Sequence, residues 1–142
     1  MIVKVINKSE NKLPEYATPG SAGMDLRASI LEPITLEPMK RVLIPTDLYM
    51  KIPEGYELQV RPRSGLALKQ GVTVINTPGT VDSDYINNVG VILINLSEEP
   101  YIINPGDRVA QAVLNKVEQI EWEEVKTLDK TNRNGGFGST GI

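Results

Sequence analysis

The chain has 142 residues, with 15 Lys and Arg against 18 Asp and Glu, a formal net charge of −3, and neither His nor Cys. This length suits one domain that can bury a core, and the composition excludes Ser/His or Cys nucleophilic triads, His-ligated zinc and disulfide bonds. Any catalysis must therefore use carboxylates, Arg or Lys, hydroxyl groups and a hard metal ion.

Charge and apolar patterning also bear on partners and location. Lys and Arg are not gathered into a stripe, which disfavours a nucleic-acid partner. The longest apolar stretch, residues 89–94, is too short to span a bilayer, so we expect no membrane partner. Polar side chains interrupt residues 1–7 too early for a secretory signal. We therefore expect a soluble, cytoplasmic protein.

Short runs of β-branched and apolar residues lie between turn-forming residues, ten of them prolines, along most of the chain. They predict strands at residues 3–5, 41–44, 56–60, 89–94 and 109–114, whereas only residues 64–70 are predicted as a helix. The pattern favours an all-β sandwich or jelly roll with one short helix. We predict a β-barrel domain over residues 1–128 and a flexible Gly-rich arm over residues 129–142.

Polar residues interrupt strand formers in two segments. Asp25 lies within residues 22–28, where it could face the hydration shell of a metal ion. Gln111 lies within residues 106–111 and could reach a phosphate or an attacking water. For Asp107 and Arg108 we favour a structural turn or ion pair.

Arg63 and Ser64 stand where a predicted strand gives way to the predicted helix. The start of a helix presents free N–H groups and the positive end of its dipole, which suits phosphate. The plain alternative is that Ser64 caps the helix and Arg63 is a surface cation.

Residues 79–85 carry two carboxylates and an aromatic ring between two predicted strands, at a predicted hairpin. Asp82 at this place can hold and deprotonate a water molecule. The alternative is that Asp82 and its neighbours serve only the turn and that Tyr85 packs across strands.

Residues 133–141 combine Arg133, Phe137, Ser139 and Thr140 with four glycines. Glycine allows close approach of the backbone to a ligand, hydroxyl groups and Arg bind phosphate, and a Phe ring can stack on a nucleobase. A flexible Gly/Ser terminus is the alternative.

Taken together, five segments between about residues 16 and 141 resemble, in order and spacing, the five motifs of the trimeric deoxyuridine triphosphatases (dUTPases). The resemblance implies a jelly-roll subunit and a homotrimer with shared active sites. Motifs one, two and four would come from one chain, motif three from a neighbour, and the arm from the remaining subunit. It also implies Mg²⁺-assisted hydrolysis of dUTP to dUMP and pyrophosphate, which would keep uracil out of DNA and supply dUMP for thymidylate synthesis.

The same resemblance assigns roles to single residues. Asp82 and Gln111 would be catalytic, with Asp82 orienting the nucleophilic water, and Asp25 would bind Mg²⁺ through water. Tyr85 would pack on the deoxyribose, Asn76 would read uracil, and Phe137 would stack over it. The full set implied to bind substrate is Arg63, Ser64, Gly65, Asn76, Gly79, Val81, Tyr85, Arg133, Phe137, Gly138, Ser139 and Thr140.

Residues 86–88, Ile-Asn-Asn, depart from the Arg-Gly that most relatives carry after the Tyr. Asn tolerates a left-handed backbone, so the hairpin turn is still expected to form. The related deoxycytidine triphosphate deaminases need a Glu where this chain has Ile92, which disfavours deamination. The fold would also suit a nucleotide-responsive regulatory trimer or a purely structural jelly-roll subunit, and the retained Asp82, Gln111 and tail motif favour catalysis over regulation.

Overall fold

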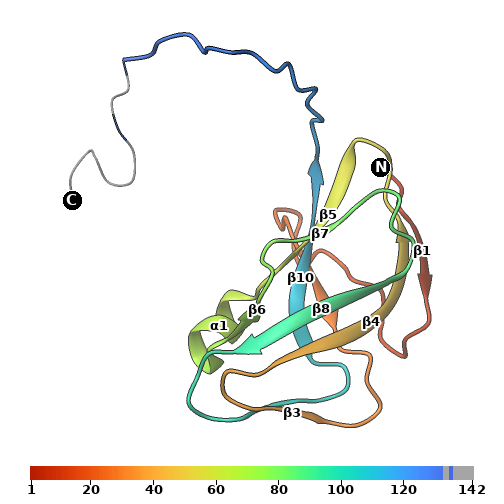
Figure 1. The fold of residues 1–142 in the computed structure, drawn as a ribbon. Coiled ribbons are helices and arrows are strands. Elements are labelled where there is room, and N and C mark those ends of the chain that lie inside the picture. The colour runs from red at the N-terminus through yellow and green to blue at the C-terminus, as the bar shows by residue number, and fades with distance from the viewer. Residues whose placement is uncertain (133–134, 136–142) are drawn as a thin grey trace.

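The computed structural model describes residues 1–132 and residue 135. The fold is an all-β sandwich of jelly-roll type with one short helix, as predicted (Figure 1). In chain order the elements are β1 (Lys4–Asn7), β2 (Met24–Arg27), β3 (Ile34–Leu36), β4 (Arg41–Lys51), β5 (Tyr56–Arg61), α1 (Ser64–Gln70), β6 (Val72–Val74), β7 (Gly79–Val81), β8 (Asn88–Asn95), β9 (Tyr101–Ile103) and β10 (Arg108–Lys116).

Two four-stranded antiparallel sheets form the sandwich. One has the order β1-β4-β8-β6 and the other the order β2-β10-β5-β7, while β3 and β9 form a separate pair. Figure 1 shows β4 and β8 running diagonally across β10. Every second side chain of β8 from Val89 to Asn95 is buried. This alternation is what a strand with one face toward a core requires.

One hydrophobic core joins the two sheets. Ile44 of β4 and Leu93 of β8 meet Leu26 of β2 and Ala110 of β10 there, and all four are fully buried. Because burial of apolar surface drives folding, this shared core fixes the two sheets against each other. The polar residues at the strand ends are therefore held by a rigid support.

Helix α1 has the bounds that the sequence predicts, Ser64–Gln70. It ends at Gly71, whose φ of 63° is left-handed and whose N–H donates to the carbonyl of Ala67. Glycine adopts this conformation without a steric penalty and so ends the helix.

The hairpin predicted at residues 79–85 is wrong. Strand β7 pairs with β5 in one sheet, whereas β8 pairs with β4 and β6 in the other, so the loop between β7 and β8 crosses between sheets. The Tyr85 N–H closes its turn on the Asp82 carbonyl at 3.1 Å. Among the described non-glycine residues, positive φ occurs at Met39 and Asp47. Neither Asn87 nor Asn88 uses the left-handed conformation that Asn tolerates.

In the described part of the chain the last strand ends at Lys116, and residues 118–132 are exposed. Figure 1 shows this segment leading away from the sheets. Large apolar side chains that it exposes are Ile120, Trp122, Val125 and Leu128. Across the described part of the chain, no helix has the length and apolar character to cross a membrane.

Candidate active site

The structure brings together Asp25, Arg63 and Gln111, which the sequence predicts as parts of one site. Strand β10 lies between β2 and β5, so Gln111 stands opposite Asp25 on one side and Arg61 on the other. Two residues beyond Arg61, the Arg63 Nε donates to the Asp25 Oδ1 at 2.8 Å. Arg108 Nη1 contacts the other oxygen of Asp25 at 3.3 Å.

Arg63 occupies the N-cap position of α1 and makes no side-chain cap hydrogen bond there. Ser64 is the first helical residue, so the alternative that it caps the helix is wrong. Both Ser64 and Gly65 are exposed at the helix start, and a Cβ added at Gly65 would meet no atom within 4 Å. Their backbone N–H groups belong to the first turn of the helix. The N–H groups of a first turn have no hydrogen-bond partners within the helix.

The Gln111 amide is held from two sides. Its Nε2 donates to the Pro62 carbonyl at 2.9 Å, just before Arg63. A Cβ added at Gly23 would lie 2.5 Å from the Gln111 Oε1, so the missing side chain of Gly23 leaves the room that this amide fills. The position of Gln111 is thus fixed by the same segment that carries Arg63.

Arg63 and Arg108 border a hollow of about 370 Å³ that gathers positive charge. Arg63, Lys69 and Arg108 line it together with a single carboxylate, Asp107. Sequence reasoning missed Lys69 and Tyr101, which enter the hollow through the packing of α1 and β9. The structural roles favoured for Asp107 and Arg108 agree with the contacts, since Asp107 accepts the Asn104 N–H at 2.8 Å and Arg108 pairs with Asp25.

The phenol of Tyr101 stays protonated at this hollow. Burial and the nearby Asp107 carboxylate raise the pKa of Tyr101, and the positive charge of Arg63 opposes them. The neutral hydroxyl can donate a hydrogen bond to an anion in the hollow.

Asp82 lies at the opposite end of strand β5. It follows Val81, which stands opposite Leu58, so Asp82 lies level with Glu57. Arg63 is six residues farther along, which at about 3.3 Å per strand residue puts the two on the order of 20 Å apart. One chain therefore does not bring Asp82 to Arg63, Asp25 and Gln111.

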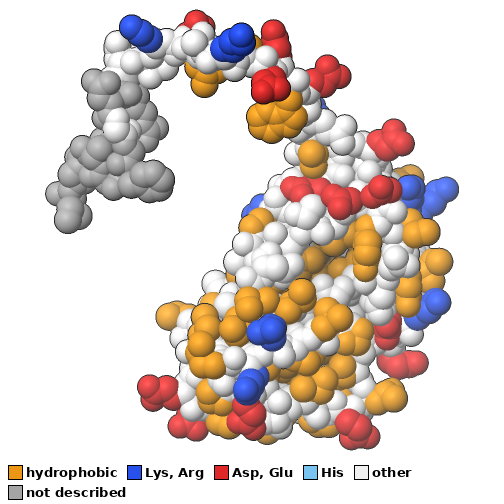
Figure 2. All heavy atoms as spheres, viewed as in Figure 1, with side chains coloured by type: hydrophobic (Ala, Val, Ile, Leu, Met, Phe, Trp, Pro, Cys, Tyr) orange, Lys and Arg blue, Asp and Glu red, His pale blue; other side chains and the backbone are white. Residues whose placement is uncertain are grey.

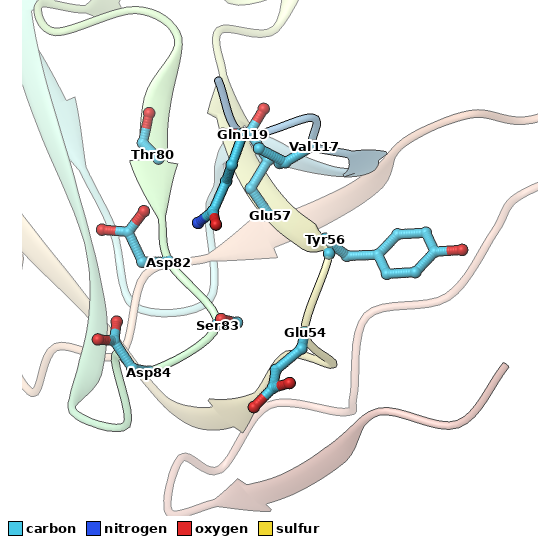
Figure 3. A pocket seen from close by; sticks show the side chains of 10 residues that line it. Glu54, Tyr56, Glu57, Thr80, Asp82, Ser83, Asp84, Val117 and Gln119 are labelled. Atoms are coloured by element: carbon cyan, nitrogen blue, oxygen red, sulfur yellow. The ribbon is translucent and has the colours of Figure 1, made fainter. Parts of the chain in front are cut away.

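Around Asp82 is a second hollow, of about 790 Å³, lined also by Glu54, Glu57, Ser83 and Asp84. Figure 3 shows Asp82 on one side of it and Gln119 and Glu57 on another, while the Tyr56 ring points away. With four carboxylates on its walls, this hollow would repel a triphosphate unless cations come from elsewhere.

The predicted uracil and sugar contacts surround β7. Gly79 stands opposite Val60, and a Cβ added to it would lie 3.2 Å from the Asn76 Nδ2. Val81 is buried, whereas Tyr85 lies outside the strands, in the loop between β7 and β8, with 40% of it exposed, so the alternative that Tyr85 packs across strands is wrong. The predicted arm residues lie outside the described part of the chain: Arg133, Phe137, Gly138, Ser139 and Thr140.

The metal-ligating groups near Asp25 suit only a metal ion that arrives with its substrate. No group of three or more candidate ligand residues is found in residues 1–132 and 135. Magnesium is often held by one or two carboxylates together with substrate phosphates, and it keeps several waters. A carboxylate has about four acceptor positions. Asp25 can therefore accept both arginines and still bind a metal-bound water.

Comparisons with known proteins point to one family. A dUTPase family model matches residues 9–141. The chain is 58% identical to the deoxyuridine 5'-triphosphate nucleotidohydrolase of Finegoldia magna, over 99% of both chains. A mutant dUTPase from phage phi11 of S. aureus, solved for its structural Mg(II) ion, is 27% identical with a TM-score of 0.80, over 89% of this chain and 98% of its own.

A further solved structure has the same fold. The dUTPase of Staphylococcus bacteriophage 80alpha, solved with dUPNHPP, superposes with a TM-score of 0.84 at 24% identity, over 99% of both chains. The family model and the Finegoldia relative extend over nearly the whole chain. The chain therefore belongs to the dUTPase family and is an enzyme.

Proposed function

We propose that this protein hydrolyses dUTP to dUMP and pyrophosphate. The observation that carries the proposal is the cluster of Arg63, Arg108 and Gln111 around Asp25, at a positively charged hollow in a chain of the dUTPase family. Because the protein has a net charge of −3, binding a triphosphate needs such a local set of cations. The reaction would keep uracil out of DNA and supply dUMP for thymidylate synthesis, and its place in the cytoplasm remains a prediction.

The proposed enzyme is a homotrimer whose active sites are shared. Its support is the separation within one chain, where Asp82 lies level with the start of β5 and Arg63 follows the end of that strand. A neighbour that places its Asp82 beside this chain's Arg63 would put the water-holding carboxylate next to the phosphates. Exposed apolar residues of segment 118–132, Trp122 among them at 89% exposure, offer a surface for contact with another copy.

In the proposed reaction Asp82 orients a water molecule and accepts its proton. The water oxygen bonds to the α-phosphorus in line, and the bond from that phosphorus to the bridging oxygen breaks, so pyrophosphate leaves with the electron pair. Arg63, Ser64 and Gln111 hold phosphate oxygens. Asp25 keeps the guanidinium of Arg63 in place before the substrate arrives. Such preorganised charge is the main catalytic resource of phosphoryl transfer.

We further propose that Asp25 binds Mg²⁺ through a water molecule. When bound, the ion neutralises negative charge on the phosphates. The support is the free acceptor capacity of Asp25 beside its two arginine partners.

The base and sugar would be read around β7 and the loop after it. Asn76, with backbone groups of Gly79 and Val81, would pair with uracil, and Tyr85 would exclude a 2'-hydroxyl group. Cytosine would leave buried polar groups unpaired, which can cost on the order of 10⁴ in selectivity. The arm, residues 129–142, would close over a neighbouring site, with its support in the sequence motif alone.

Product analysis tests the proposal most simply. The purified protein is incubated with Mg²⁺ and equal amounts of dUTP, dCTP, dTTP and UTP, and the products are separated. We expect selective formation of dUMP and pyrophosphate. Ammonia released from dCTP would point to deamination instead, and no turnover of any nucleotide by the folded protein would contradict the proposal.

A further inference from the structure

The loop between β7 and β8, which carries Asp82 and Tyr85, is tied to strand β4 at two places. Near its start, Lys51 Nζ donates to the Ser83 carbonyl at 3.1 Å. At its end, Asn88 pairs with Asp47 through two hydrogen bonds. The Asp47 N–H donates to Asn88 Oδ1 at 3.0 Å, and Asn88 Nδ2 donates to Asp47 Oδ1 at 2.7 Å.

Asp47 holds an unusual backbone conformation at this point. Its φ is 54°, in the left-handed region that favours glycine, and it lies where the β4–β8 register shifts between Pro45 and Tyr49. The second carboxylate oxygen accepts the Ser29 hydroxyl at 2.6 Å. Short bonds to an ionised carboxylate are stronger than neutral ones. These hydrogen bonds offset the free-energy cost of a left-handed backbone at a residue other than glycine.

Asn88 connects Asp47 to Tyr85. The Tyr85 hydroxyl donates to the Asn88 backbone carbonyl at 2.9 Å, and the Tyr85 N–H closes the turn on Asp82. The phenol ring is thus held at both ends, by its own backbone and by the carbonyl of Asn88, whose side chain Asp47 binds. Because 40% of Tyr85 is exposed, packing constrains the ring only in part, and these hydrogen bonds add to the constraint.

We propose that Asp47 and Asn88 are positioning residues for Tyr85 and so set the preference for deoxyribose over ribose. The inference rests on the proposed function, because it concerns the sugar of the same substrate. A ring held in one place excludes a 2'-hydroxyl group, whereas a ring that can shift makes room for it. Discrimination by shape needs a stiff pocket. Asp47 supplies that stiffness from outside the site.

Asp47→Gly tests the proposal with Met39→Gly as a matched control. Both residues are non-glycine with left-handed φ, 54° and 59°, so glycine relieves the backbone of each in the same way. Only Asp47→Gly removes the carboxylate that binds the Asn88 Nδ2 and the Ser29 hydroxyl, and it leaves the backbone hydrogen bond of residue 47 to Asn88 Oδ1. We expect the dUTP-to-UTP ratio of kcat/KM to fall about tenfold in Asp47→Gly, the effect of losing the charge-assisted hydrogen bond to Asn88, and to stay at the parent value in Met39→Gly.

A conservative variant separates positioning from plain stability. Asp47→Asn keeps an acceptor for Asn88 and tolerates the left-handed backbone, so it should retain the parent ratio. If Asp47→Gly loses stability but keeps the same nucleotide ratio as Met39→Gly, the pair only ties β4 to β8 and the proposal is overturned.

Hydrogen exchange keeps the test independent of the proposed function. Amides of residues 82–88 should exchange faster in Asp47→Gly than in Met39→Gly, whether or not the protein turns over nucleotide. Equal exchange in the two variants overturns the anchoring itself. If the parent protein hydrolyses neither dUTP nor UTP, the proposed function fails and the sugar preference fails with it, while the exchange result still decides the anchoring.

Discussion

At the scale of single residues, the proposed chemistry depends most on Asp82. Asp82→Asn should lower kcat about 10² to 10⁴-fold, the usual contribution of a general base, while the affinity for dUTP stays near that of the parent protein. Steady-state kinetics and equilibrium binding of dUTP separate these two effects.

Glu57→Gln is the matched control for that prediction. Glu57 lies level with Asp82 on β5 and lines the same hollow, so its substitution removes a carboxylate without removing the proposed base. It should leave kcat within about threefold of the parent, as expected for a residue outside the transition state. An equal loss in both variants would mean that the charge of the hollow matters and not Asp82 itself.

Sequence reasoning identified some residues in or beside the positively charged hollow and missed others. Asp25, Arg63 and Gln111 stand in recognisable motifs, and the structure brings them together. Tyr101 carries no such signal, because it reaches the hollow only through the packing of β9. Asp47 is also invisible in the sequence, since neither its left-handed backbone nor its partner Asn88 follows from local pattern.

At the scale of elements, Asn95 joins the end of β8 to its surroundings. This fully buried side chain donates to the carbonyls of Leu36 and Glu99 and accepts the Ser97 N–H and hydroxyl. Asn95→Ala should lower the free energy of unfolding by about 2 to 4 kcal/mol, because several buried polar groups lose their partner. Urea unfolding measures the loss.

Asn115→Ala is the control on β10. Its side chain is only half-buried and makes one hydrogen bond, to the Val113 carbonyl at 3.3 Å. The free energy of unfolding should change by less than about 1 kcal/mol. Equal losses in the two variants would contradict the special role of Asn95.

Local elements were more predictable than their pairing. The helix bounds agree fully, because the helix depends on neighbouring residues and ends at a glycine. The predicted hairpin after Gly79 is wrong, because β7 and β8 take partners from distant parts of the chain. A run of strand formers indicates a strand, whereas its partner depends on the packing of two whole sheets.

At the scale of the whole molecule, one chain carries two groups of proposed active-site residues that lie apart from each other. The phosphate residues gather around Asp25 at one end of β5, and Asp82 lies at the other end in an acidic hollow. Sequence spacing alone cannot reveal this separation, because the motifs follow one another closely along the chain. Figure 2 shows the body of the molecule and the exposed segment that leaves it, a shape with surface to offer another copy.

Complementation between two inactive variants tests this shared site most directly. Asp82→Asn removes the base, and Arg63→Met removes the phosphate contact while keeping the side-chain stem, so each variant alone should be nearly inactive. If each site takes Arg63 from one chain and Asp82 from another, an equal mixture refolded together should regain about a quarter of the parent dUTP turnover, since about one site in four combines two intact residues. If the folded mixture stays as inactive as its components, the two residues do not meet across chains and the shared site is contradicted.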